Sequence, residues 1–262
     1  MKVLVIAINT FKEAVRDRIF YNLLFFALLL ICSSILFATL TVGEQSKIII
    51  DMGLASINIF GVFISIMLGI GLISKEIEKR TIYTIIAKPV HRYQFLIGKY
   101  IGLLVTVIVN TVIMGMGLYL VLMFNEFRWS HGIFNVNIDI WKAIYLMSIE
   151  FMVITAIAIL FSTFSSSSTL SAIFAIATFI IGHLTEDIKL MGDKVAGRPL
   201  KVVINFLYYL LPNLDNFNVK GRVVYGLEVP LSYILIVTLY GLLYITCLLI
   251  IAGFIFQKRD FK

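Results

Sequence analysis

The sequence predicts an all-α membrane protein with six transmembrane helices, an N-terminal amphipathic helix and both termini in the cytosol. Hydrophobic residues make up 60% of the 262 residues and charged residues only 14%, whereas soluble domains keep about a quarter of their residues charged. Six apolar runs are long enough to cross about 30 Å of hydrocarbon. Basic residues gather at the connections on one side of these runs. These three observations indicate a single transmembrane domain, residues 1–262.

Each of the six runs provides the roughly 20 apolar residues that a spanning helix needs. They cover residues 20–41, 53–73, 98–124, 141–163, 168–186 and 231–256. A seventh run, residues 200–211, is bracketed by Pro199 and Pro212 and would reach only about 18 Å as a helix. We expect a short re-entrant or interfacial helix there, inside an outer loop at residues 187–230.

The N-terminal segment, residues 1–18, carries four basic residues among apolar residues at helical spacing, including Ile8, Phe11 and Val15. This pattern is typical of an amphipathic helix that lies in the membrane interface. The apolar run that follows is longer than the hydrophobic region of a signal peptide and has no clean cleavage site. We therefore expect it to remain in the mature protein as the first span.

The basic residues fix the expected orientation. With six spans, the two termini and the connection between the second and third spans share one side, which holds thirteen basic and five acidic residues. The opposite loops hold nine of each. The positive-inside rule places the basic side in the cytosol, as expected for a protein of the cytoplasmic membrane. This distribution accounts for the net charge of +7 without a nucleic-acid partner.

Residues 74–99, here called the 74–99 segment, form the only long, strongly charged stretch that interrupts the first half of the sequence. Ile77, Thr81 and Ile85 recur at four-residue spacing, which predicts that the second span continues as an amphipathic helix. Pro89 should end this helix, because proline disfavours helical geometry at the residue before it. A second short helix, residues 92–98, would lead into the third span. The alternative is a basic loop that only fixes topology.

The motif in this segment resembles the cytosolic loop of ABC-2 type transporter permeases, in which an E…RT…KPV.R…GK pattern joins the second and third spans. The resemblance extends over nearly the whole chain, including the N-terminal elbow helix, the six spans and the outer segment. The stretch YYLLPNLDNFNV at residues 208–219 is similar to a subgroup that includes permeases linked to nitrous-oxide-reductase maturation and gliding motility. The residues that carry the loop motif, which the resemblance makes the ATPase-coupling residues, are Glu76, Glu78, Lys79, Arg80, Thr81, Lys88, Pro89 and Arg92.

The resemblance implies an exporter built from two such subunits, either two copies of this chain or one copy and a homologous permease. Each subunit would dock one of two separate ABC ATPase chains through the N-terminal region and the 74–99 segment. The family places the subunits in lipid and places ATP and Mg in the partner ATPase, with no cofactor in this chain. The sequence agrees, because a phosphate-binding loop needs G-x-x-x-x-G-K-[ST], whereas Gly98-Lys99 is followed by Tyr100, and Tyr93 replaces the first glycine.

Glu150 is the strongest single-residue signal, because it lies about 14 Å into the fourth span. An ionisable group at that depth is costly and usually faces a protein interior or a water path. Asn110 of the third span should lie at nearly the same depth. We hypothesise that Glu150, protonated or hydrogen-bonded to Asn110, lies at a helix contact, at a dimer contact or along the transport path. A structural polar clamp within one subunit is the alternative.

Two weaker patterns complete the candidate sites. Gly61, Ser65 and Gly69 form a small-residue stripe that allows close helix packing, either for packing alone or for movement between transport states. His183, Glu186 and Asp187 lie together near the outer end of the fifth span, but no second histidine or cysteine is near, so we expect solvated loop residues and no metal.

Two alternative functions, an intramembrane protease and a secondary carrier that works alone, fit the sequence less well. An intramembrane protease needs a nucleophile beside a base, but Ser165–Ser168 and His183 would lie about 22 Å apart. A secondary carrier that works alone usually needs broken helices and several intramembrane charges, and only Glu150 lies deep inside a span. The span composition suits a lipid or amphiphile, an ion or a drug equally well.

Overall fold

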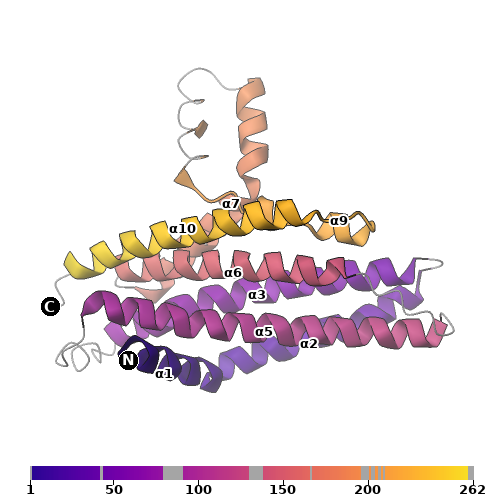
Figure 1. Ribbon diagram of the computed structural model, residues 1–262, viewed down its shortest axis with the longest axis horizontal. Coiled ribbons are helices and arrows are strands. Elements are labelled where there is room, and N and C mark those ends of the chain that lie inside the picture. Colours follow the sequence, from indigo (N-terminus) through magenta and orange to yellow (C-terminus); the bar gives the residue numbers. More distant parts are fainter. Residues whose placement is uncertain are drawn as a thin grey trace.

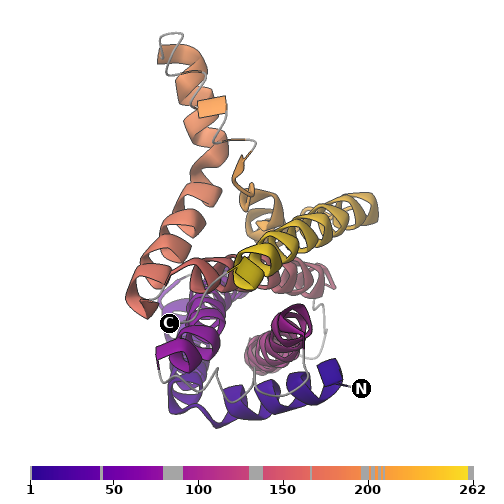
Figure 2. The same cartoon turned by 90° about the vertical axis from the view of Figure 1, so that its left-hand side faces the viewer.

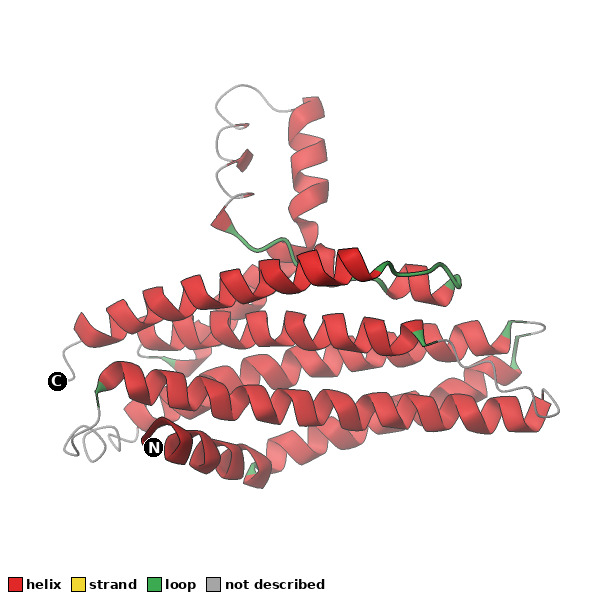
Figure 3. Cartoon of the chain, viewed as in Figure 1, coloured by secondary structure: helices red, strands yellow, loops and turns green. Residues whose placement is uncertain are grey.

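The computed structural model describes residues 2–41, 44–78, 91–129, 138–165, 167–195, 201, 204, 205, 208 and 210–258. Every element in this part of the chain is a helix (Figure 3). Six helices are long and apolar enough to span a membrane, which confirms the number of predicted spans. They are α2 (Arg18–Thr39), α3 (Gln45–Glu78), α5 (Arg92–Trp129), α6 (Asp139–Phe164), α7 (Ser168–Val195) and α10 (Leu231–Lys258).

Five of these helices run roughly side by side, and α7 leans out of the bundle (Figures 1 and 2). Helix α6 lies at the centre, where it packs against α3, α5, α7 and α10. Its sequence is apolar on every side, which is typical of a fully buried helix. Most of its residues are buried, including Ala143, Phe151 and Ala158.

Several helix boundaries differ from those expected. Helix α3 begins at Gln45, before the expected span, and its continuation to Glu78 agrees with the predicted helical extension of the second span. Helix α5 is one unbroken helix from Arg92 to Trp129. The expectation of a separate helix at residues 92–98 is therefore wrong. No helix-ending residue lies between Arg92 and the apolar run, so the helix continues into the span. Pro89 and the helix end expected there lie outside the described residues.

The α3–α6 contact uses the small-residue stripe. A Cβ added at Gly61 would overlap the ring of Phe151, and one at Gly69 would lie 2.6 Å from Ala158 Cβ. Ser65, between them, is fully buried and donates its hydroxyl to Gly61 O at 2.7 Å. The stripe thus lets the two backbones approach closely, as small residues do between membrane helices.

Helix α1 (Lys2–Arg16) lies across one end of the bundle, against α5 (Figure 2). Added Cβ atoms at Gly98 and Gly102 would clash with the backbone and side chains of α1. Lys99 is buried between the helices, and its ammonium pairs with Glu13 of α1 at 3.3 Å. Two glycines and a buried ion pair therefore position α1 on α5.

The outer segment is more compact than the predicted loop. Helix α7 continues to Val195, and residues 210–230 return as the 3₁₀ helix η1 (Asp215–Phe217) and the short helix α9 (Lys220–Val224). Leu214, Phe217 and Val223 are buried, and η1 and α9 contact α3, α6 and α7. Residues 187–195 of the expected outer loop extend α7, and residues 212–230 pack into the bundle through these apolar side chains. The short helix expected at 200–211 lies in part outside the described residues.

Candidate functional site

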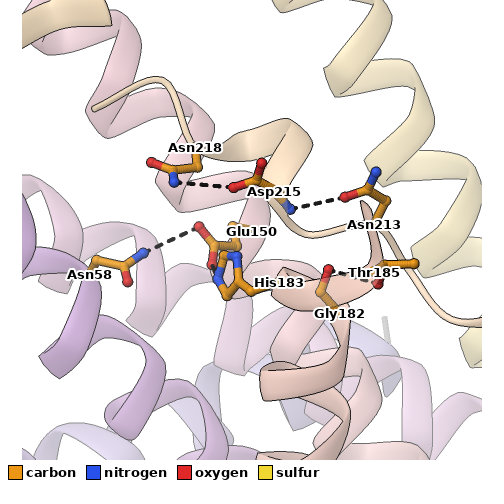
Figure 4. A network of polar contacts seen from close by, with 8 residues as sticks. All are labelled: Asn58, Glu150, Gly182, His183, Thr185, Asn213, Asp215 and Asn218. Atoms are coloured by element: carbon orange, nitrogen blue, oxygen red, sulfur yellow. Dashed lines mark hydrogen bonds and ion pairs between the residues drawn. The ribbon is translucent and has the colours of Figure 1, made fainter. Parts of the chain in front are cut away.

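A buried polar cluster joins three spans around Glu150 (Figure 4). Asn58 Nδ2 donates to Glu150 Oε2 at 3.3 Å, and His183 Nε2 lies 3.0 Å from Glu150 Oε1. The Glu150 side chain is 1% exposed and that of His183 is 23% exposed. Both carboxylate oxygens are therefore engaged inside the protein.

Each member of the cluster comes from a different helix. Asn58 lies on α3, Glu150 on α6 and His183 on α7. The ring of Phe179, one turn earlier on α7, packs edge-on against the imidazole at 4.7 Å between centroids. The leaning helix α7 is thus held to the bundle by a polar contact at this level.

The pairing with histidine explains how a carboxyl group is kept here. A buried charge is tolerated only when it is paired and hydrogen-bonded. His183 meets this condition for Glu150, because its imidazole lies within hydrogen-bond distance of the buried carboxylate. A partner of this kind lowers the cost of placing the carboxyl group inside a membrane.

The outer segment folds beside this cluster. Leu214 N donates to Gly182 O at 3.0 Å, next to His183 in α7. Asn213 Oδ1 accepts from Asp215 N at 3.2 Å, and Asn213 Nδ2 reaches Glu186 at 3.3 Å. Glu186 is thus tied to the outer segment and is not simply solvated.

Lys220 supplies a positive charge on this side. Burial lowers the pKa of Lys220 below its usual value, although the negative charges of Glu150, Asp51 and Asp215 act in the opposite direction. The half-buried amine of Lys220 therefore lies within the electrostatic influence of three carboxylates, one of which is the His183 partner Glu150.

Two expectations about this site need correction. Glu150 bonds Asn58 and His183 in place of Asn110, and Asn110 Oδ1 is buried with no hydrogen-bond partner in the described part of the chain. Asn110 and Glu150 were expected at the same depth in the membrane, but their side chains do not face each other. His183 was expected in a solvated loop, but α7 continues beyond it to Val195 and turns it toward α6.

The sequence pattern missed Asn58, Asn213, Asp215 and Lys220. Asn58 could have been noticed as an amide inside the second span, but its partner could not. The Asn213–Asp215 turn lies within the YYLLPNLDNFNV stretch that carried the resemblance to the permease subgroup. Leu214 of that stretch is buried and bonds α7 at Gly182, next to His183.

Of the motif residues in the 74–99 segment, Glu76 and Glu78 lie in the last turns of α3. Lys79, Arg80, Thr81, Lys88 and Pro89 lie outside the described residues. Arg92 begins α5, and its Nη1 donates to the carbonyls of Phe256 and Gln257 at 3.1 Å each. The guanidinium of Arg92 therefore contacts the end of α10.

A cavity of about 380 Å³ lies between α2, α3 and α7. Its walls are mainly apolar, with Phe20, Leu23 and Met67 among them, and its polar lining comes from Asp17, Ser168 and Thr169. The cavity lies at the end of the bundle where α2 and α7 begin. Its mainly apolar lining with a few polar groups suits an amphiphilic molecule.

The geometry gives no support to proteolysis by Ser168 and His183. Both residues lie on the continuous helix α7, at opposite ends of a stretch about 22 Å long. The imidazole instead contacts Glu150.

The chain matches the family model described as "ABC-2 family transporter protein" over residues 4–261. No curated protein matches the chain. Permeases of this family are transmembrane components that are not themselves catalytic, and they generally work with an ABC ATPase. The family match spans nearly the whole chain and agrees with six apolar helices in the structure, so this integral membrane protein belongs to the ABC-2 transporter family.

Proposed function

We propose that this chain is the permease subunit of an ABC-2 type exporter in the cytoplasmic membrane. Two copies, or one copy and a homologous permease, form the substrate path, and two separate ABC ATPase subunits bind ATP and Mg and supply the energy. The observation that carries this proposal is the family match over residues 4–261.

The arrangement of the chain ends supports ATPase docking at one end of the bundle. Helix α1, the end of α3, the start of α5 and the end of α10 lie together there (Figure 1). This end also carries the surplus of basic residues identified in the sequence. Under this proposal it faces the cytosol, α1 lies in the membrane interface, and the ATPase binds α1 and the 74–99 segment.

The α2–α3–α7 cavity supports a path for an apolar or amphiphilic substrate. It lies at the same end as the expected ATPase site, and its lining is mostly apolar with one carboxylate, Asp17. A substrate that enters from the inner leaflet would meet this cavity before it reaches the level of Glu150.

Co-purification tests the proposal. The tagged chain is expressed together with the products of its neighbouring genes, and we expect an ABC ATPase to co-purify with it in a stable complex that hydrolyses nucleotide. Reversing the charges of Glu76, Glu78 and Arg80 should weaken the complex by at least about tenfold, because these charges lie on the expected docking side. Arg92 is left unchanged because it contacts α10.

The matched control reverses Arg222 and Glu228, which are exposed at the opposite end of the bundle. These changes should leave ATPase binding intact. If no ATPase associates with the wild-type chain, or if both sets of reversals weaken binding equally, the proposed function is wrong.

A further inference from the structure

The contact between Arg92 and α10 joins two elements far apart in the sequence. Arg92 Nη1 donates to Phe256 O and to Gln257 O, both at 3.1 Å. These carbonyls belong to the last turn of α10, which ends at Lys258. Arg92 lies in the 74–99 segment, so one end of this segment is bound directly to the last span.

Helix chemistry makes this an effective cap. The last four carbonyls of an α-helix have no partner within the helix, and they carry the negative end of the helix dipole. A guanidinium is always charged and presents several donors in a rigid plane. Arg92 therefore supplies both hydrogen bonds and a favourable charge to the end of α10.

Packing beside the guanidinium strengthens the same contact. The ring of Phe95, one turn further along α5, stacks on Phe256 with 6.1 Å between centroids and 17° between planes. Phe95 is 5% exposed and Phe256 is 1% exposed. The contact thus combines a buried aromatic pair with a charged cap.

A groove beside this contact separates α5 from α10 along part of their length. It has a volume of about 380 Å³ and is lined by residues of both helices, including Tyr93, Ile97, Leu249 and Gly253. Gly253 has nothing within 4 Å of an added Cβ. The Arg92–Phe95–Phe256 contact is therefore a local joint at the end of α10.

We propose that Arg92 is a positioning residue that couples the 74–99 segment to α10, so that displacement of the segment is transmitted to the last span. This inference rests on the proposed function, in which the partner ATPase acts on the segment. Its structural basis, the capping of α10, is independent of any partner and is tested by itself.

The first experiment uses the full chain alone in lipid nanodiscs. Amide hydrogen exchange is measured in the last two turns of α10 for Arg92→Ala, Arg92→Glu and Arg92→Lys. We expect Arg92→Ala to speed exchange by about 3- to 10-fold, as loss of a favourable helix-end charge would. Arg92→Glu should have a larger effect, and Arg92→Lys should restore part of the protection.

Arg18→Ala is the matched control, because Arg18 is an exposed arginine at the same end of the bundle. It should leave exchange in α10 unchanged. Unchanged exchange in Arg92→Ala, or equal acceleration in Arg18→Ala, would overturn the capping role.

The second experiment uses the complex with the partner ATPase, with and without ATP and vanadate. In the wild type, trapping nucleotide should change exchange both at the start of α5 and at the end of α10. In Arg92→Ala the change at α5 should remain, and the change at α10 should be lost. A change at α10 that persists in this variant would disprove transmission through Arg92. Failure of any ATPase to bind the wild type would refute the proposed function and this transmission role, but the exchange measured on the chain alone would still report on the cap.

Discussion

Glu150 shows how a single carboxylate is accommodated among apolar helices. It has two hydrogen-bond partners on two different spans, and His183 is the closer one. Replacing only one member leaves the other buried without its partner, which costs more than the pair contributes as a whole. The cluster thus makes the positions of α3, α6 and α7 interdependent.

A double-mutant cycle on Glu150→Gln and His183→Gln measures this dependence. We expect a coupling free energy of about 0.5–2 kcal/mol, the range for polar contacts between membrane helices. The measurement is the free energy of unfolding by SDS in mixed micelles.

The control cycle combines Glu150→Gln with Asn110→Leu. These two changes should add within about 0.5 kcal/mol, because no hydrogen bond joins the two residues. A coupling between Glu150 and Asn110 as large as that between Glu150 and His183 would contradict the observed pairing.

The site could be predicted only in part, and the reason is geometric. Glu150 stands out because charge is rare in a span, and counting residues gives its depth along the helix. Counting does not give the direction in which a side chain points relative to neighbouring helices, so Asn110 was chosen and Asn58 was missed. His183 was misplaced because, with no second histidine or cysteine near it, it was grouped with the neighbouring acids Glu186 and Asp187 as a solvated residue.

At the scale of elements, the number and order of helices follow from the sequence, because apolar runs of spanning length have few alternatives in a bilayer. The spacing of Gly61, Ser65 and Gly69 predicts a packing face on α3. It does not identify α6 as the neighbour, since every span is apolar. The start of α3 at Gln45 and the end of α5 at Trp129 lie beyond the expected spans, because polar residues can extend a helix beyond the apolar run.

Substituting Gly69 tests the closeness of α3 and α6. Gly69→Ala should destabilise the fold by about 1–3 kcal/mol, the usual cost of overpacking, because the new methyl would meet Ala158 and the carbonyl of Thr155. Thermal unfolding in detergent, followed by intrinsic fluorescence, gives the change.

Gly253→Ala in α10 is the matched glycine substitution. Its added methyl has open space, so stability should stay within about 0.5 kcal/mol of the wild type. Equal losses in the two variants would show that helix propensity or membrane insertion, and not the α3–α6 contact, sets the cost.

For the whole molecule, the structure brings α1, the end of α3, the start of α5 and the end of α10 to one end of the bundle (Figure 1). The charge distribution predicts that this end is cytosolic. The folding of residues 212–230 against the opposite end could not be predicted, because its short apolar positions resemble an ordinary loop. Only the tertiary contacts of Leu214 and Phe217 show that it is packed.

Cysteine labelling tests this orientation. In a chain whose native Cys32 and Cys247 are replaced by serine, Tyr225→Cys should react with a membrane-impermeant maleimide in intact cells, since Tyr225 is 73% exposed at the outer end. Lys12→Cys, on the exposed face of α1, should react only after the membrane is permeabilised. Labelling of Lys12→Cys in intact cells would mean that the orientation is reversed.

The packing of α1 against α5 also has a consequence for biogenesis. The first helix to be translated contacts α5 far more extensively than α2, and it needs Gly98, Gly102 and the ammonium of Lys99 for its place. That place does not exist until the third span has been synthesised and inserted. This late docking of α1 adds little entropic cost, because the cost of bringing two chain segments together grows slowly with the length of the chain between them. The order of assembly therefore differs from the order of translation: the N-terminal helix docks only after three spans are in the membrane.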